Sequence, residues 1–430
     1  MRGLVSRIVF ARSLMLLHVL ATWCLGVALK ITGKELTFPA LEHQRDVASH
    51  RNPLLLAKQP PKAACGDWHH TYAKLHAQIR QEGRGRYMFH QCDEGQADCF
   101  AGMVSAFYLS VLSGRAFFTG KYSYQYFFEG RTSGHLSAAF EQPFINWDLP
   151  FALFRERFHD GAHFMLQGMH AGQISPRKIT SIYDTAMGED EAVTIFSNAG
   201  VLHRLFEIPG FRKQMEEKLK VSLENAFGCA LNFLFWPKNE FHYTLKNEEA
   251  LRRTISKGRP VIGLHLRSGD AVFQTGTGVV NDVSGVNRTF HGAIACVDEI
   301  QKRVMVQHGI PAVLLVLSDD MLVRRSMAEI FPNYVVAYND VLKPEHTGPF
   351  QGSGVTVQGL QTAAAEFWMF GVSDYQITWR YSGFGRAAAV RTMPSKPINM
   401  YVLENYAEPR PCGPTDQVSF LDVARMLPGI

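Results

Sequence analysis

The stretch VIGLHLRSGD, residues 261–270, is an apolar run that ends in a histidine, an arginine and an aspartate. Its apolar half is typical of a buried strand. It opens a regular alternation, in which we predict strands at 312–317, 334–338 and 375–379 and helices around 289–308, after Asp320 and around 355–372. Strands that alternate with helices imply a parallel sheet with helices on both faces. The sequence therefore predicts an α/β fold.

A second unit of this kind is predicted upstream. An apolar strand runs into a turn within 83–95, a helix at 100–114 ends at Gly114, and the strand RAFFTG follows at 115–120. The middle of the chain is rich in aromatic residues and ends in a predicted amphipathic helix at 213–227. With 430 residues, the chain exceeds the roughly 250–300 residues at which one hydrophobic core stops growing, so two lobes are expected.

Composition excludes several classes of protein. Apolar residues make up 46% of the chain and charged residues 19%, which argues against a disordered chain, a coiled coil or a polytopic membrane protein. The net charge of +5 is small and dispersed along the sequence. It gives no indication of a nucleic-acid partner.

The N-terminus resembles a secretory-pathway entry signal. Three arginines precede an apolar stretch at 13–29, and polar sequence follows it. We expect a retained type II membrane anchor with a cytoplasmic N-terminus and a lumenal body, because the apolar run is longer than the usual signal-peptide core of about 7–15 residues. The alternative is a cleaved signal peptide and a secreted protein, with Gly26 and Ala28 as the small residues before the cut.

The cysteine count fits a lumenal body. Six cysteines follow the anchor, namely Cys65, Cys92, Cys99, Cys229, Cys296 and Cys412. An even number permits disulfides, and we predict only the pair Cys92–Cys99, whose short separation closes a small loop. Buried free thiols are the alternative. Asn287 begins the only acceptor tripeptide for N-glycosylation, which predicts a surface loop there.

Polar clusters follow three of the predicted strands. They are His265, Arg267 and Asp270 after the first, Ser318, Asp319 and Asp320 after the second, and Ser382, Gly383, Phe384 and Gly385 after the last. Ligands of such sheets bind at the carboxyl ends of the strands. An arginine there suits phosphate oxygens, a small-residue turn that opens a helix presents amides to an anion, and acidic side chains suit nucleoside donors. Together the clusters predict a nucleoside diphosphate site.

Structural roles compete with this interpretation. A lone arginine near a strand end commonly forms a surface salt bridge, and Asp319 and Asp320 suit the N-cap and first turn of the following helix. The coincidence of three clusters at successive strand ends favours the binding role.

These stretches resemble the GT-B-type fucosyltransferases, a two-lobed superfamily that includes α-1,2-, α-1,6- and protein O-fucosyltransferases. HLRSGD at 265–270 is similar to their H-x-R-x-G-D motif, and LSDD at 317–320 is similar to their second nucleotide segment. AAAEFWMFGVSDYQITWRYSGFG at 363–385 is similar to their third. YMFHQCDEG at 87–95, with the helix and strand after it, resembles the start of their acceptor lobe. The resemblance spans about 85–395.

The resemblance implies a function and residue roles. The chain would transfer fucose from GDP-fucose to a glycan or glycoprotein hydroxyl with inversion and without a metal cofactor. Arg267 would bind the donor diphosphate, Glu366 would contact guanine, and the turn Ser382–Gly385 would meet the phosphate. Asp270 is grouped with Arg267 as catalytic. Asp270 and Asp282 are the nearest carboxylates in the sequence, and the choice of general base stays open between them. The sequence after Asp270 lacks the glutamate of the α-1,6 branch, which disfavours that branch.

The implied organisation divides the chain into six parts. They are a cytoplasmic tail (1–12), a signal-anchor transmembrane helix (13–29), a linker (30–65), an acceptor-side lobe (66–255), a GDP-sugar-binding lobe (256–408) and a C-terminal tail (409–430). We expect the protein in the Golgi membrane. The alternative function on the same fold is a catalytically silent lumenal protein that binds a nucleotide or a glycan.

Other catalytic motifs are absent or incomplete. The nearest metal motif is HDGAH at 159–163, where His159 and His163 have the spacing of one helix face. Asp160 stands in place of the required glutamate, and Gly161 weakens the helix that the motif needs. The sequence contains no D-x-D, the motif that commonly marks a sugar nucleotide bound through a metal ion. We therefore expect no metal site.

Overall fold

The structure is a computed structural model of the chain. It describes residues 62–92, 95–120, 136–148, 151–158, 161–166, 174–238, 245–246, 251, 253, 257–268, 280–340, 356–393 and 399–425. All of them belong to one compact unit, Asn52–Ile430. No helix within these ranges is long and apolar enough to cross a membrane, and the anchor predicted at 13–29 lies outside them.

A four-stranded parallel sheet holds the first part of the described chain. Its strand order is β2-β1-β5-β4, formed by β1 (Tyr87–Gln91), β2 (Ala116–Gly120), β4 (Ala162–Met165) and β5 (Ala192–Phe196). The helices around it are α4 (Lys62–Cys65), α5 (His69–Glu82), α6 (Gln96–Ser113), α8 (Phe151–Phe158), α9 (Pro176–Met187), α10 (Leu202–Leu205), α11 (Pro209–Lys213) and α12 (Leu223–Leu234). The predicted strand–helix–strand unit is confirmed as β1-α6-β2, and Gly114 is the C-cap that closes α6, as expected.

A six-stranded sheet holds the last part, in the order β12-β11-β8-β9-β10-β7. The strands are β7 (Leu245–Lys246), β8 (Val261–Leu266), β9 (Val313–Ser318), β10 (Val336–Asn339), β11 (Tyr375–Trp379) and β12 (Met400–Leu403). All are parallel except β7, which pairs antiparallel with β10. The helices are α15 (Val283–Thr289), α16 (His291–His308), α17 (Met321–Ile330), α18 (Val357–Val372) and α19 (Gly383–Val390). The predicted α/β fold with parallel sheets is confirmed.

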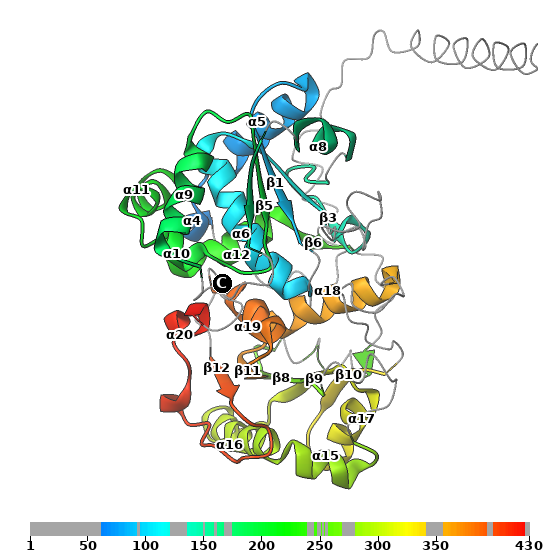
Figure 1. The fold of residues 1–430 in the computed structure, drawn as a ribbon. Coiled ribbons are helices and arrows are strands. Elements are labelled where there is room, and N and C mark those ends of the chain that lie inside the picture. Colours follow the sequence, from blue (N-terminus) through cyan, green and yellow to red (C-terminus); the bar gives the residue numbers. More distant parts are fainter. Residues whose placement is uncertain are drawn as a thin grey trace, which may run out of the picture. The chain divides into compact units, whose positions relative to one another are not determined.

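Helices α6, α18 and α19 connect the two sheets (Figure 1). α6 is apolar around most of its circumference and almost completely buried. Phe100 of α6 contacts Phe367 of α18, with ring centroids 5.4 Å apart. The short strand β3 (Phe140–Glu141) pairs with β6 (Trp236–Pro237). The ring centroid of Phe140 lies 5.2 Å from that of Trp368 of α18. One hydrophobic core therefore continues from the first sheet to the second.

The amphipathic helix predicted at 213–227 is not continuous. α11 ends at Lys213, a π-helical segment η3 covers Gln214–Leu219, and α12 begins at Leu223. Lys220 between them has a φ of 57° and is left-handed, which is rare for a residue other than glycine. Its amide donates to the carbonyl of Met215, which closes the segment. Hydrophobic periodicity does not reveal such a break, because the apolar residues on both sides of it remain buried.

Three disulfides connect the described cysteines, and the predicted pair Cys92–Cys99 is confirmed. Cys65–Cys229 joins α4 to α12, and Cys296–Cys412 joins α16 to the segment after β12.

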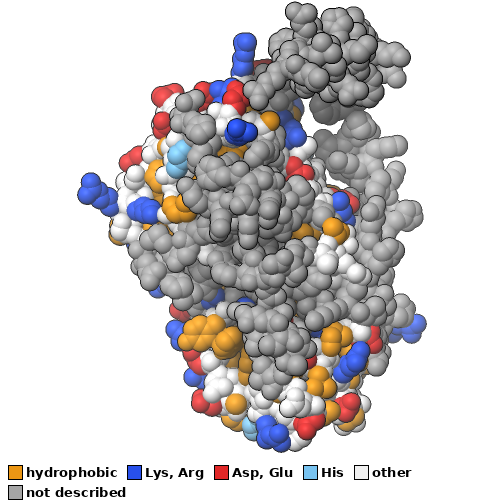
Figure 2. All heavy atoms as spheres, turned by 45° about the vertical axis from the view of Figure 1, so that its right-hand side comes forward, with side chains coloured by type: hydrophobic (Ala, Val, Ile, Leu, Met, Phe, Trp, Pro, Cys, Tyr) orange, Lys and Arg blue, Asp and Glu red, His pale blue; other side chains and the backbone are white. Residues whose placement is uncertain are grey.

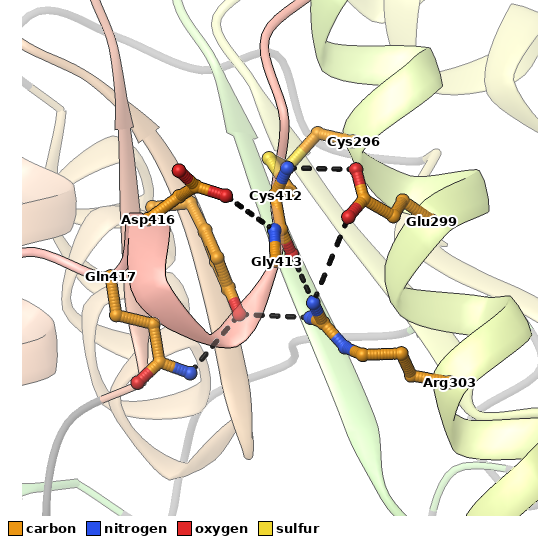
Figure 3. Close-up of a disulfide and its surroundings, with 8 residues drawn as sticks. Cys296, Glu299, Arg303, Cys412, Gly413, Asp416 and Gln417 are labelled. Atoms are coloured by element: carbon orange, nitrogen blue, oxygen red, sulfur yellow. Dashed lines mark hydrogen bonds and ion pairs between the residues drawn. A yellow bond between two sulfur atoms is a disulfide. The ribbon is translucent and has the colours of Figure 1, made fainter.

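The segment after β12, within the part named a tail from the sequence, is ordered around Cys412 (Figure 3). Glu299 of α16 accepts a hydrogen bond from the Cys412 amide at 2.8 Å, and Arg303 donates to the Cys412 carbonyl. The short helices η4 (Pro414–Asp416) and α20 (Phe420–Arg425) follow, and Phe420, Val423 and Ala424 join the core that the two sheets share.

Charges are mixed on the visible surface. Basic and acidic side chains are interspersed among the described residues visible in Figure 2, and those residues form no broad basic patch of the kind that binds nucleic acid.

Candidate functional site

The carboxyl ends of three neighbouring strands form the candidate site. β11, β8 and β9 lie side by side and parallel, so the residues that follow them meet at one edge of the sheet. The structure thus brings together the described members of all three predicted clusters. Asp270, predicted to be catalytic, lies outside the described residues, so its placement stays a prediction.

His265, near the end of β8, faces the start of α19. Its Nδ1 lies 3.3 Å from the hydroxyl oxygen of Ser382 and 3.4 Å from that of Thr378. The ring packs at 5.3 Å from the ring of Phe384, and 8% of the residue is exposed. Burial, and then the positive charges of Arg267 and Arg324, lower its pKa to about 3. At neutral pH the imidazole is therefore neutral, which suits a group that hydrogen-bonds rather than one that carries charge.

Gly385 allows this close packing. A Cβ atom built at Gly385 would lie 2.3 Å from the Thr378 hydroxyl oxygen and 3.3 Å from His265 Nδ1. Any larger residue would push α19 away from the ends of β8 and β11. The small-residue turn that the sequence assigns to phosphate binding thus also lets the first turn of α19 approach the strand ends. Ser382 is fully buried, while Gly383 and Phe384 are half-buried.

Arg267 follows β8 and is half-buried. Its amide donates to the hydroxyl oxygen of Tyr406 at 3.2 Å, and that hydroxyl donates to the carbonyl of His265 at 3.1 Å. Tyr406 is buried, and burial raises its pKa. Tyr406 therefore holds the backbone of His265 and Arg267 in place, and with it the position of the Arg267 Cα atom. Sequence reasoning missed Tyr406, because it lies beyond the last motif and no local pattern marks it.

The cluster after β9 mainly holds backbone. Asp319 Oδ1 accepts a hydrogen bond from the Ser268 amide at 2.7 Å, which ties the loop after β8 to the loop after β9. Asp320 Oδ1 accepts from the Leu322 amide at 2.8 Å, so Asp320 is the N-cap of α17. The Ser318 hydroxyl accepts from the Asp320 amide at 3.1 Å. The capping role considered for Asp320 is confirmed, and Ser318 and Asp319 stabilise the same edge of the sheet.

Glu366 of α18 is paired within the chain. Its two carboxylate oxygens accept hydrogen bonds from Arg324 at 2.5 and 3.0 Å, and Arg324 is fully buried. Arg324 Nε also donates to the Ser318 carbonyl at 2.7 Å. The pair connects α17, α18 and the end of β9. The resemblance assigns Glu366 to guanine, whereas in the structure this carboxylate has a bidentate arginine partner.

Two further predicted residues lie on α15. Asp282, one of the carboxylates considered as general base, is its N-cap and accepts a hydrogen bond from the Gly285 amide at 2.6 Å. Asn287 is exposed, but it lies on this helix and not in a loop, because the cap starts the helix ahead of the acceptor tripeptide. The surface position predicted for Asn287 is therefore correct and the loop is wrong.

The near-match to a zinc motif does not form a helix. His163 is exposed on strand β4, so its four-residue separation from His159 cannot place both on one helix face. His159 lies outside the described residues. Within the part of the chain that the structure describes, no three His, Cys, Asp or Glu side chains are grouped as metal ligands would be.

Comparisons with solved structures identify the fold. No protein-family model and no curated protein matches the sequence. FUT1 of Arabidopsis thaliana, solved as an arginine-to-lysine mutant in complex with GDP, is similar at a TM-score of 0.54 and 15% identity, over 88% of this chain and 87% of that chain. The fucosyltransferase NodZ from Bradyrhizobium matches 74% of this chain and 96% of its own, at a TM-score of 0.42 and 17% identity. The likeness to FUT1 shows that this chain has the GT-B-like α/β fold of that protein.

Proposed function

We propose that the chain is an inverting, metal-independent glycosyltransferase that moves fucose from GDP-fucose to a hydroxyl of a glycan or glycoprotein. The observation that carries the proposal is the meeting of three strand ends at one edge of the six-stranded sheet, with Arg267, His265 and the start of α19 side by side. The FUT1 structure, which shares the fold, holds GDP, and this supports a GDP-sugar donor.

The proposed chemistry assigns a role to each group. The acceptor oxygen attacks the anomeric carbon as the bond from sugar to phosphate breaks, and GDP leaves with the bonding electrons. Arg267 and the amides at the start of α19 stabilise the charge that builds on the diphosphate. Neutral His265 fixes the Ser382 turn through its Nδ1. A carboxylate takes the proton of the acceptor hydroxyl, and the candidate is Asp270, three positions after Arg267.

Localisation in the Golgi membrane, as a single-pass type II protein with a lumenal body, is part of the proposal. Its support is the apolar stretch at 13–29 with arginines before it, together with three disulfides, which persist in oxidising compartments. N-glycosylation at exposed Asn287 fits the same compartment.

The test is release of free GDP from GDP-fucose by the full chain, with a chelator present and with GDP-mannose and UDP-galactose as alternative donors. We expect slow release that is selective for GDP-fucose. Arg267→Ala should lower the rate by about 100- to 1,000-fold, the loss expected when one stabilising donor is removed. Arg288→Ala, at an exposed residue of α15, is the matched control and should leave the rate unchanged. Absence of release from every donor, combined with no GDP binding in calorimetry, would overturn the proposal.

A silent GDP-binding protein is the second candidate. The acidic groups expected to contact the nucleoside already have partners within the chain, Asp319 at the Ser268 amide and Glu366 at Arg324. GDP binding in calorimetry without release of GDP from GDP-fucose, in the presence of a panel of glycan acceptors, would favour this candidate.

A further inference from the structure

Arg386, on the second turn of α19, is a buried cation whose terminal nitrogens are unused. Only 1% of the residue is exposed. Its Nε donates to the carbonyl of Ser382 at 3.2 Å, so the side chain folds back toward the start of the helix. Among the residues that the structure describes, neither Nη1 nor Nη2 of Arg386 has a hydrogen-bond partner.

The other buried arginines that the structure describes, Arg115, Arg324 and Arg391, all have partners at both terminal nitrogens. Arg324 has the Glu366 carboxylate and the Ser318 carbonyl. Arg115, also fully buried, donates to three carbonyls, those of Ala186, Gly188 and Asp190. A buried charge without hydrogen bonds lowers stability, so such a group persists where it serves a ligand.

The position of Arg386 relates it to the proposed donor site. Ser382, which holds its Nε, is the residue whose hydroxyl meets His265. α19 packs against α6, and Asp98 in the first turn of α6 acts electrostatically on Arg386. Burial outweighs that attraction and lowers the pKa of Arg386 to about 10, so the guanidinium remains charged at neutral pH. The free edge of the guanidinium thus lies near the start of α19, where the helix amides favour an anion.

We infer that Arg386 binds an oxyanion of the substrate through its two terminal nitrogens and acts as a second arginine beside Arg267. This inference rests on the proposed function for the identity of the substrate. The parallel N–H groups of a guanidinium match two oxygens of a phosphate or a carboxylate. The oxyanion is either the donor diphosphate or an acid group of the acceptor. In the first case Arg386 shares the charge that builds on the leaving GDP.

The test compares wild type, Arg386→Met, Arg386→Lys and the exposed control Arg288→Met in the full chain. Calorimetry measures binding of GDP, guanosine, inorganic pyrophosphate and an oligosaccharide that ends in glucuronic acid. If the ligand is the donor phosphate, Arg386→Met weakens GDP and pyrophosphate binding by about 10- to 100-fold and leaves guanosine binding unchanged. If the ligand is an acceptor acid, only the oligosaccharide is affected. Arg386→Lys retains the positive charge but not the paired N–H groups of the guanidinium, so it should bind the ligand more tightly than Arg386→Met and less tightly than the wild type.

Thermal unfolding separates this role from a structural one. Removal of an unsatisfied buried charge should leave the unfolding temperature of ligand-free Arg386→Met equal to or above that of the wild type. A lowered unfolding temperature together with unchanged binding of all four probes would overturn the inference. The two proposals can also fail separately. If the wild type does not bind GDP, the proposed donor is wrong, whereas Arg386-dependent binding of pyrophosphate would still support an oxyanion site.

Discussion

The two sheets each place a histidine near the carboxyl end of a central strand, and they use it differently. In the four-stranded sheet, His90 Nδ1 lies 3.0 Å from the Thr119 hydroxyl oxygen, Nε2 lies 3.1 Å from the Ser197 carbonyl, and the residue is fully buried. In the six-stranded sheet, His265 Nδ1 meets both Thr378 and Ser382. Nε2 of His265 has no partner among the described residues.

The difference lies in how many parts of the fold each histidine joins, and it agrees with the donor site proposed at the edge of the six-stranded sheet. Both ring nitrogens of His90 make hydrogen bonds to neighbouring segments of the fold. The ring therefore connects β1 to Thr119 of β2 and to Ser197, the residue after β5. His265 Nδ1 contacts the turn that opens α19, and the ring lies close to the half-buried Arg267 in the chain, with no Nε2 bond to a described residue. His90 is thus bonded at both nitrogens within the fold, while the described bonds of His265 involve Nδ1 alone.

The largest expected effect is a loss of stability when the buried pair Arg324–Glu366, beside the candidate site, is broken. Glu366→Ala leaves the fully buried Arg324 without its carboxylate, and should lower the free energy of unfolding by about 3–5 kcal/mol. Chemical denaturation measures the loss. Glu404→Ala, which breaks the exposed pair with Arg380, is the control and should change stability little. Equal effects of the two substitutions would mean that the buried pair does not hold α17 and α18 together.

Replacing each of the two histidines by alanine, in separate variants, sharpens the comparison. His90→Ala leaves buried polar groups unsatisfied and should lower the free energy of unfolding by about 2–3 kcal/mol without changing GDP affinity. His265→Ala should cost less stability and weaken GDP binding by about tenfold, because it releases the Ser382 turn. Denaturation and calorimetry on both variants give the two readouts. A loss of GDP affinity in His90→Ala alone would reverse the assignment of the two sheet edges.

The pH dependence of stability gives a smaller effect. Burial lowers the pKa of His90 to about 4, against about 6.5 in an unfolded chain. Between those values the unfolded state binds the proton and the folded state does not, so stability is lost as the pH falls from 6.5 toward 4. Each such histidine contributes up to about 1.4 kcal/mol per pH unit in that window. Burial lowers the pKa of His69 and His76 to about 4 as well, so several groups add to the slope.

Replacement of one histidine should remove its share of that slope. His90→Gln should give a flatter dependence of the unfolding free energy on pH between 6.5 and 4 than the wild type, while His308→Gln, on the exposed end of α16, should leave it unchanged. Denaturation curves at several pH values measure this. An unchanged slope in His90→Gln would show that folding does not lower the pKa of His90.

The strands of the six-stranded sheet were predicted closely where a short apolar run lies between two turns. The strand predicted at 375–379 has the same bounds in the structure, and the one at 312–317 is shifted by one residue, because both are short apolar runs between turns. The left-handed Lys220 and the π-helical segment before it were not predictable, because tertiary packing overrides a helical pattern there.

The site was predicted in its location but not in its internal partners. Parallel strands bring their carboxyl ends to one edge, so the three clusters could be placed together from the sequence alone. The pair Arg324–Glu366, the Tyr406 contact and the open nitrogens of Arg386 depend on residues up to 141 positions apart. No spacing rule reports contacts of that kind.

The Cys296–Cys412 bond has a consequence for the order in which the protein is made. A ribosome adds Cys412 more than a hundred residues after Cys296, since the two are separated by 116 positions. Cys296 on α16 therefore has no partner thiol at position 412 until the strands β9 to β12 and the segment beyond them have been synthesised. A chain cut short before Cys412 would contain every strand of the six-stranded sheet and still carry an unpaired Cys296 thiol, open to exchange with other disulfides.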